Sequence, residues 1–128
     1  MKAIVIETDG KIYPIDLRKP LYRSASRILE GYFEIVRPRG LARPYCFLAN
    51  ETGLLQGLPR NDVGSWLYQS HIHGHPIAGN IILLKEGRYD LVGLDPAEIV
   101  NITAEMSVLR EFLAAEKIFQ EGNYASNI

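Results

Sequence analysis

The chain has 128 residues, of which 47% are hydrophobic and 23% are charged. This composition is typical of one folded domain, and a chain of this length can bury a core without a disulfide or a structural metal. The formal net charge of −1 and the pI of about 6.3 argue against duplex DNA as the principal partner. No apolar stretch approaches the roughly 20 residues of a transmembrane helix, so no membrane role is expected.

The charges are distributed unevenly along the sequence. Residues 11–43 include eight basic and three acidic residues, whereas residues 44–128 include five basic and ten acidic residues. Such an asymmetry favours a face that attracts phosphates or carboxylates. It is also typical of solvated faces that partly neutralise each other, or of complementary surfaces in a head-to-tail oligomer.

The predicted elements begin with a β-hairpin. Residues 3–7 and 11–17 are β-prone, and Gly10 allows a tight turn between them. Apolar residues at spacings of three and four then predict an amphipathic helix over residues 21–30, which Gly31 ends.

Two strands follow on either side of a loop that is rich in arginine. They are predicted over residues 32–36 and 45–49, and Pro38 ends the first because proline cannot donate a backbone hydrogen bond to a neighbouring strand. Residues 51–53 offer a turn into residues 54–56. This pattern predicts a second hairpin.

The next segment combines a short helix with two more strands. Asn61 or Asp62 can cap a helix over residues 63–68, since both side chains accept hydrogen bonds from free N–H groups. Residues 81–85 are continuously apolar, as in a strand buried on both faces, and residues 89–94 predict a further strand.

A long helix is predicted after residue 94. Asp95 is a good N-cap, Pro96 suits the first helical position, and Glu98 can reach back to the cap. An apolar stripe continues at helical spacing through Ile102, Met106, Leu109 and Leu113.

Together these elements predict an α+β fold in one domain. We expect a mixed, mainly antiparallel sheet of five or six strands, packed by two main helices. The domain is expected over residues 1–122, with residues 94–122 as a helical C-terminal extension that ends at Gly122. Residues 123–128 are expected to form a flexible tail.

All three histidines, His71, His73 and His75, lie in one short stretch. On an extended backbone their imidazoles would project from one face, and such imidazoles can bind a transition metal. Gly74 and Pro76 favour a turn instead, and no acidic residue or cysteine lies nearby in the sequence. We therefore expect surface histidines and no cofactor; a metal site, or one histidine as a general base, is the alternative.

The loop over residues 37–44 is the leading candidate for a binding site. Arg37, Arg39 and Arg43 alternate there with proline, glycine and small residues, which leave backbone amides accessible. Guanidinium groups bind phosphate or carboxylate oxygens through paired N–H donors. The loop therefore predicts a site for a nucleotide, a nucleic-acid backbone or an acidic protein surface, with an ordinary solvated loop as the alternative.

The sequence lacks the local motifs of common enzymes. It has no nucleophile elbow, no phosphate-binding loop of the Walker type and no His-Glu-x-x-His. Its single cysteine, Cys46, lies in an apolar run and is expected to be a buried hydrophobic residue in a reducing cytoplasm. We expect a protein without catalytic activity, although catalytic residues can also assemble from distant parts of a chain.

Several segments occur in an order that resembles a known family. They are Met1-Lys-Ala-Ile-Val-Ile6, Tyr32-Phe-Glu-Ile-Val-Arg37, residues 49–61, residues 73–80 and Leu91-Val-Gly-Leu94. Over residues 1–94 the chain resembles the uncharacterised family named domain of unknown function 3846. The resemblance implies a small protein of bacteriophages, plasmids or conjugative elements and their Gram-positive hosts. It implies no activity and no functional residues.

These observations lead to three hypotheses of function. The first is an accessory protein of a phage or mobile element that binds an anionic, nucleotide-like ligand or a host protein near Arg37, Arg39 and Arg43. The second is a small hydrolase that depends on a metal or on the histidines. The third is a structural homo-oligomer, for which the long helix after Asp95 is the candidate contact.

Overall fold

Six strands and four helices occupy the part of the chain that the structure, a computed structural model, describes: residues 1–126, with side chains to residue 117. The strands are β1 (Lys2–Ile6), β2 (Ile12–Asp16), β3 (Phe33–Val36), β4 (Tyr45–Asn50), β5 (Ile81–Glu86) and β6 (Leu91–Val92). The helices are α1 (Leu21–Leu29), α2 (Asp62–Leu67), α3 (Ser70–His73) and α4 (Pro96–Ser126).

The strands form one open sheet in the order β2-β1-β5-β4-β3, and β6 pairs with the end of β5. Every pairing between these strands is antiparallel. The predicted α+β domain with a five- or six-stranded sheet is therefore confirmed, and the sheet is antiparallel throughout and not mixed. β5 lies at its centre and is fully buried from Ile81 to Leu84, as its apolar sequence predicts.

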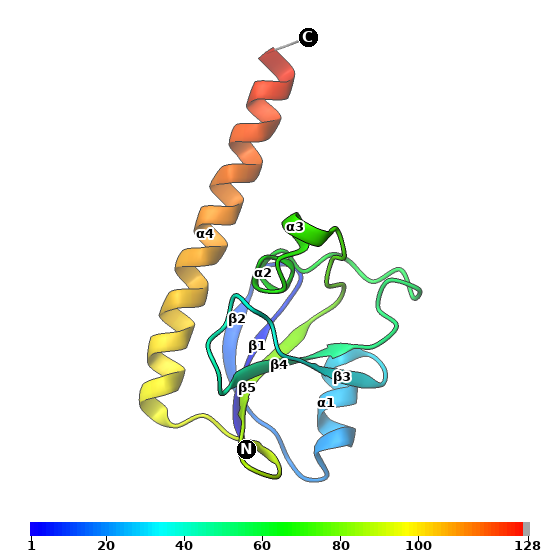
Figure 1. Ribbon diagram of the computed structural model, residues 1–128, viewed down its shortest axis with the longest axis vertical. Coiled ribbons are helices and arrows are strands. Elements are labelled where there is room, and N and C mark those ends of the chain that lie inside the picture. The colour runs from blue at the N-terminus through cyan, green and yellow to red at the C-terminus, as the bar shows by residue number, and fades with distance from the viewer. Residues whose placement is uncertain (127–128) are drawn as a thin grey trace.

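Different helices cover the two faces of the sheet (Figure 1). On β5, Ile81 and Leu83 belong to a core shared with α2 and α4, whereas Ile82 and Leu84 belong to a core shared with α1. This division follows from the alternation of side chains along a strand. The layers are thus α1, the sheet, and then α2 with α4.

α4 begins with the predicted capping box. The N–H of Glu98 donates to Oδ1 of Asp95 at 2.8 Å, and the N–H of Asp95 donates to Oε1 of Glu98 at 3.0 Å. The predicted stripe packs against the sheet core, with Ile102 and Met106 buried. The later turns of α4, orange to red in Figure 1, project beyond the sheet. No helix in the described residues is both long and apolar enough to cross a bilayer.

The predicted hairpin from residues 45–49 into residues 54–56 is wrong. Residues 51–57 form consecutive turns and no strand. Leu54 and Leu55 are 59% and 89% exposed, so a strand there would have no core to cover. The second hairpin instead joins β3 to β4, and the arginine loop is its connection.

The predicted end of the last helix at Gly122 is also wrong, because α4 continues to Ser126. A glycine inside a helix costs only about 1 kcal/mol relative to alanine, so it does not have to end one. Residues 123–126 of the predicted flexible tail are therefore helical, and residues 127–128 lie outside the described part of the chain.

Candidate functional site

The arginine loop, residues 37–44, is fixed to the body of the domain in its middle and at its C-terminal end. In the middle, the N–H of Gly40 donates to the carbonyl oxygen of Leu67 at 3.1 Å, and a Cβ at Gly40 would lie only 2.7 Å from that oxygen. Glycine therefore permits the approach of the loop to α2. At the C-terminal end, the N–H of Glu86 donates to the carbonyl oxygen of Pro44 at 2.9 Å.

A paired hydrogen bond holds the first arginine of the loop. Nε and Nη2 of Arg37 donate to the two carboxylate oxygens of Glu86, the second at 3.0 Å. This bond lowers the pKa of Glu86 and raises the pKa of Arg37, so both groups stay ionised at neutral pH. Arg37 is thereby fixed at the end of β5.

The loop and the end of β5 enclose a hollow of about 730 Å³, here called the arginine hollow. Its charged lining residues are Arg37, Arg39, Arg43 and Glu86, which leave an excess of two positive charges. Among the side chains to residue 117, none forms an ion pair with Arg39 or Arg43, and both are exposed. The fold thus brings the three predicted arginines together around one concave surface.

One wall of the arginine hollow is tied to α4. Tyr45, which lines the hollow, donates from its hydroxyl to Oε2 of Glu98, and Nζ of Lys85 donates to Oε1 at 2.6 Å. The backbone hydrogen bond from Asp95, followed by the bonds from Lys85 and Tyr45, lowers the pKa of Glu98 to about 2. Sequence reasoning did not select Tyr45 or Glu86, because they join the arginines only through the pairing of β3, β4 and β5.

The three histidines do not converge on one point, although the ring centroids of His73 and His75 lie 5.4 Å apart. The ring of His71 stacks on Trp66 with centroids 4.3 Å apart. Nε2 of His73 lies 2.7 Å from the carbonyl oxygen of Tyr68, and the N–H of His75 donates to Nδ1 of His73 at 3.3 Å. Backbone groups therefore occupy both ring nitrogens of His73.

The short helix α3 explains this separation. Side chains two residues apart share a face on a strand, but they point in nearly opposite directions on a helical turn. His71 and His73 lie on such a turn, which Gly74 ends in a left-handed conformation with φ of 81°. Within residues 1–117, no three His, Cys, Asp or Glu side chains form a group that could hold a metal ion.

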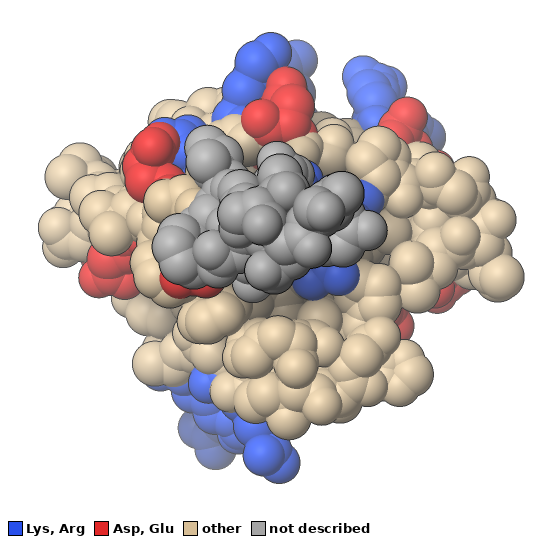
Figure 2. All heavy atoms as spheres, turned by 90° about the horizontal axis from the view of Figure 1, so that it is seen from above, with Lys and Arg blue, Asp and Glu red and all other residues tan. Residues whose placement is uncertain are grey.

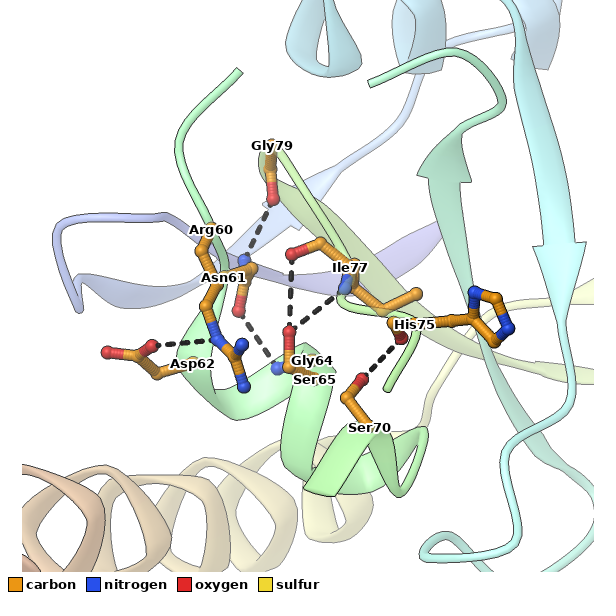
Figure 3. A network of polar contacts seen from close by, with 9 residues as sticks. All are labelled: Arg60, Asn61, Asp62, Gly64, Ser65, Ser70, His75, Ile77 and Gly79. Atoms are coloured by element: carbon orange, nitrogen blue, oxygen red, sulfur yellow. Dashed lines mark hydrogen bonds and ion pairs between the residues drawn. The ribbon is translucent and has the colours of Figure 1, made fainter. Parts of the chain in front are cut away.

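Buried polar groups hold the segment that leads to the histidines (Figure 3). Asn61 is only 1% exposed, and its side-chain amide donates to the carbonyl oxygens of Ile6 and Gly79, at 3.0 Å each. Its Oδ1 accepts from the N–H of Gly64 at 2.9 Å, so Asn61, one of the two predicted candidates, caps α2. All the hydrogen-bonding capacity of this amide is used inside the fold, apart from a second lone pair of Oδ1.

Two serines continue the same network (Figure 3). Oγ of Ser65 accepts from the N–H of Ile77 at 2.9 Å and lies 3.3 Å from the carbonyl oxygen of the same residue. Oγ of Ser70 donates to the carbonyl oxygen of His75 at 2.6 Å. The chain that follows the histidines is therefore fastened to α2 and α3.

Asn50 has a comparable role at the end of β4. Its amide donates to the carbonyl oxygen of Leu29 at 2.9 Å, and its Oδ1 accepts from the N–H of Thr52 at 2.8 Å. The turn predicted over residues 51–53 is therefore confirmed, whereas Arg60 forms an isolated antiparallel bridge with Ala78. Cys46 is fully buried, which raises the pKa of its thiol to about 11, so it is not a reactive thiolate at neutral pH.

A family model described as "Domain of unknown function (DUF3846)" matches residues 1–107. Comparisons with curated proteins and with solved structures found no match. The matched residues include the whole sheet, α1, α2, α3 and the first turns of α4, and therefore extend further than the resemblance over residues 1–94. The match covers well over half of the chain, and the protein thus belongs to the family of domain of unknown function DUF3846.

Proposed function

We propose that the protein binds an anionic ligand in the arginine hollow and has no catalytic role. The observation that carries this proposal is the combination of a fixed loop with two exposed guanidinium groups that lack carboxylate partners among the described side chains. The contacts of Gly40 and Pro44 hold the backbone, so a ligand would meet Arg39 and Arg43 on a loop that is already ordered. Preorganisation of this kind reduces the entropy that binding consumes.

The size and charge of the hollow favour a small ligand with two anionic groups. A volume of about 730 Å³ lies within the range of roughly 300–1,000 Å³ that small-molecule sites occupy. The excess of two positive charges matches a diphosphate such as that of a nucleotide, and arginine binds each phosphate through paired N–H donors. A host protein that presents a phosphate or an acidic side chain would use the same groups.

The wider role in this proposal is that of an accessory protein of a phage or mobile element. That setting comes from the family resemblance and not from the site. The histidine-dependent hydrolase has less support, because the ring nitrogens of His73 are occupied by backbone groups and His71 stacks on Trp66.

Calorimetric titration with ADP, GDP and pyrophosphate tests the binding proposal. We expect saturable binding and a raised unfolding temperature, since a ligand at 100 times its dissociation constant stabilises the folded state by about 2.7 kcal/mol. Each of Arg39→Ala and Arg43→Ala should weaken binding about tenfold, because charge-assisted hydrogen bonds contribute about 1.5–3 kcal/mol each.

The matched control is Arg60→Ala, which removes an exposed arginine that lines a different hollow, beside Trp66. The affinity of Arg60→Ala for the three anions should equal that of the wild type. Equal losses in Arg60→Ala and Arg39→Ala would show a general charge effect, and the absence of binding by all three anions would contradict the proposal.

Exposed apolar residues on α4 favour the homo-oligomer as a second candidate. Val100, Val108 and Phe112 are 68%, 70% and 48% exposed in the single chain. Light scattering during size-exclusion chromatography should then show a dimer or larger species that Val108→Glu converts to a monomer. A monomer at all concentrations of the wild type would exclude this candidate.

A further inference from the structure

Two more hollows adjoin the arginine hollow. A hollow of about 920 Å³ shares Arg37, Glu86 and Gly87 with it. A third, of about 380 Å³, shares Lys19 and Pro20 with the second. Because neighbouring hollows share lining residues, the three follow one another from α1, past the end of β5, to the arginine loop, and together they are here called the groove.

The groove carries a strong local excess of positive charge. Its cationic lining residues are Arg18, Lys19, Arg23, Arg27, Arg37, Arg39, Arg43 and Arg88. Its acidic lining residues are Asp16, Glu86 and Asp90, so eight positive charges face three negative ones. Seven of the eight basic residues of the segment over residues 11–43 thus line these three hollows, in a protein whose net charge is −1.

Two of these three carboxylates already have a cationic partner in the structure. Asp16 accepts from the N-terminal amino group at 2.8 Å and lies 3.3 Å from Nζ of Lys2. Glu86 is held by Arg37. Figure 2 shows lysine and arginine side chains projecting at opposite margins of the molecule. Among the side chains to residue 117, none forms an ion pair with the other cations of the groove, which are therefore available to an anion from solvent.

The start of α1 adds to this positive potential. Pro20, which precedes the first turn, supplies no side-chain cap, and the first turn contains no acidic residue. The free N–H groups and the helix dipole make such an end attractive to a phosphate. Pro20 lines both the second and the third hollow, so this helix end lies where the two meet.

An aromatic ring lies among these charges. Tyr89 lines the second hollow and is 84% exposed, and the guanidinium carbon of Arg88 is 5.5 Å from its ring centroid. A basic groove with an exposed aromatic ring is the arrangement that binds single-stranded nucleic acid, in which cations follow the backbone and rings stack on bases. An acidic peptide would form ion pairs with the cations but would leave the ring of Tyr89 without a stacking partner.

We propose that the groove binds single-stranded nucleic acid, with its phosphates along the arginines and a base stacked on Tyr89. This inference rests on the proposed function, because the arginine hollow would hold the phosphates at one end of the strand. Arg23 and Arg27, on the exposed side of α1, would hold the other end.

Fluorescence anisotropy with a labelled oligo(dT) of about 15 nucleotides tests this inference. The logarithm of the binding constant should fall linearly with the logarithm of salt concentration, with a slope of about −0.7 for each phosphate contacted. The double variant Arg23→Ala/Arg27→Ala should bind at least tenfold more weakly, and Tyr89→Ala about tenfold more weakly because stacking on one base is lost. Lys11→Ala, an exposed lysine outside the groove, should bind like the wild type.

The outcomes separate this inference from the proposed function. In one outcome, ADP or pyrophosphate binds through Arg39 and Arg43, oligo(dT) binds no more tightly than these anions, and Arg23→Ala/Arg27→Ala does not change the affinity for oligo(dT). That outcome overturns the inference and leaves the proposed function standing. If none of these ligands binds, both are overturned. Competition by polyglutamate as strong as that by oligo(dT), with no effect of Tyr89→Ala, would assign the groove to an acidic protein. Tighter binding of a duplex of equal length would also overturn the inference.

Discussion

The segment over residues 50–80 and the arginine loop over residues 37–44 are both unusual in sequence, yet the fold treats their polar groups in opposite ways. In the first segment, Asn61 and Ser65 are buried and bonded to backbone groups. In the second, Arg39 and Arg43 are exposed on a loop whose backbone is fixed. Polar side chains that are hydrogen-bonded within the fold contribute to stability. Polar side chains that are held in place but exposed, with no partner in the fold, are available to bind a ligand.

The arginine loop, the leading candidate in the sequence, is also the region that the structure favours for a site. The segment over residues 50–80 contains all three histidines and the single tryptophan, which made it the alternative. In the structure its conspicuous residues close turns, cap α2 or stack on one another. The arginine loop has a plainer sequence, but it lines a hollow.

The largest expected effect is that of Asn61→Ala. This change removes three hydrogen bonds and leaves the carbonyl oxygens of Ile6 and Gly79 without that donor, so we expect a loss of about 3 kcal/mol in the free energy of unfolding. Urea unfolding followed by circular dichroism measures the loss. Asn101→Ala is the matched control, because Asn101 is exposed on α4 and alanine is the better helix former.

If the two regions are independent, folded Asn61→Ala molecules should bind pyrophosphate and oligo(dT) as the wild type does. An Asn61→Ala protein that keeps its full stability would show that the network around α2 is dispensable. One that stays folded but loses oligo(dT) or pyrophosphate binding would show that the two regions are not separate in function.

A smaller effect is expected at Glu98, which ties a wall of the arginine hollow to α4. The pKa of Glu98 is lowered from 4.5 to about 2, so its contribution to stability is complete above the ordinary value and is lost as the pH falls from about 4.5 towards 2. Glu98→Gln should lower the free energy of unfolding by about 1–2 kcal/mol at pH 7, through weaker bonds to Lys85 and Tyr45.

Unfolding curves between pH 7 and pH 2 measure this dependence. The difference between wild type and Glu98→Gln should shrink as the pH falls through that window. A constant difference across the range would contradict an ionised Glu98 as its source. Glu105→Gln is the control, since Glu105 is an exposed glutamate on the same helix.

The smallest effect is expected for His71→Ala. His71 is exposed, and its main contact is the stacking on Trp66, so we expect a loss of at most about 1 kcal/mol in stability. Anion and metal affinities should not change. A zinc-dependent rise in the unfolding temperature that disappears in His71→Ala would contradict this contrast between the two regions, because it would show that the histidine segment binds a metal.

Local signals in the sequence predicted most of the fold. The turn at Gly10, the cap at Asn61 and the capping box of Asp95 and Glu98 depend on neighbours within a few residues, and each was confirmed. The hairpin into residues 54–56 was predicted wrongly because a turn sequence does not show whether the next segment has a core to cover.

The candidate site was only partly visible in the sequence. Arginine spacing indicated Arg37, Arg39 and Arg43, but the partner of Arg37 is Glu86, 49 residues away. Arg23 on α1 and Arg88 after β5 lie 65 residues apart in the sequence, and they line two hollows that share Lys19 and Pro20. The excess of basic residues over residues 11–43 was the one linear sign of this surface.

α4 has 31 residues, which at 1.5 Å per residue gives a helix about 46 Å long. Near its start, the carboxylate of Glu98 accepts a hydrogen bond from Tyr45, which lines the arginine hollow. A single side chain therefore connects the candidate binding site directly to the longest element of the molecule.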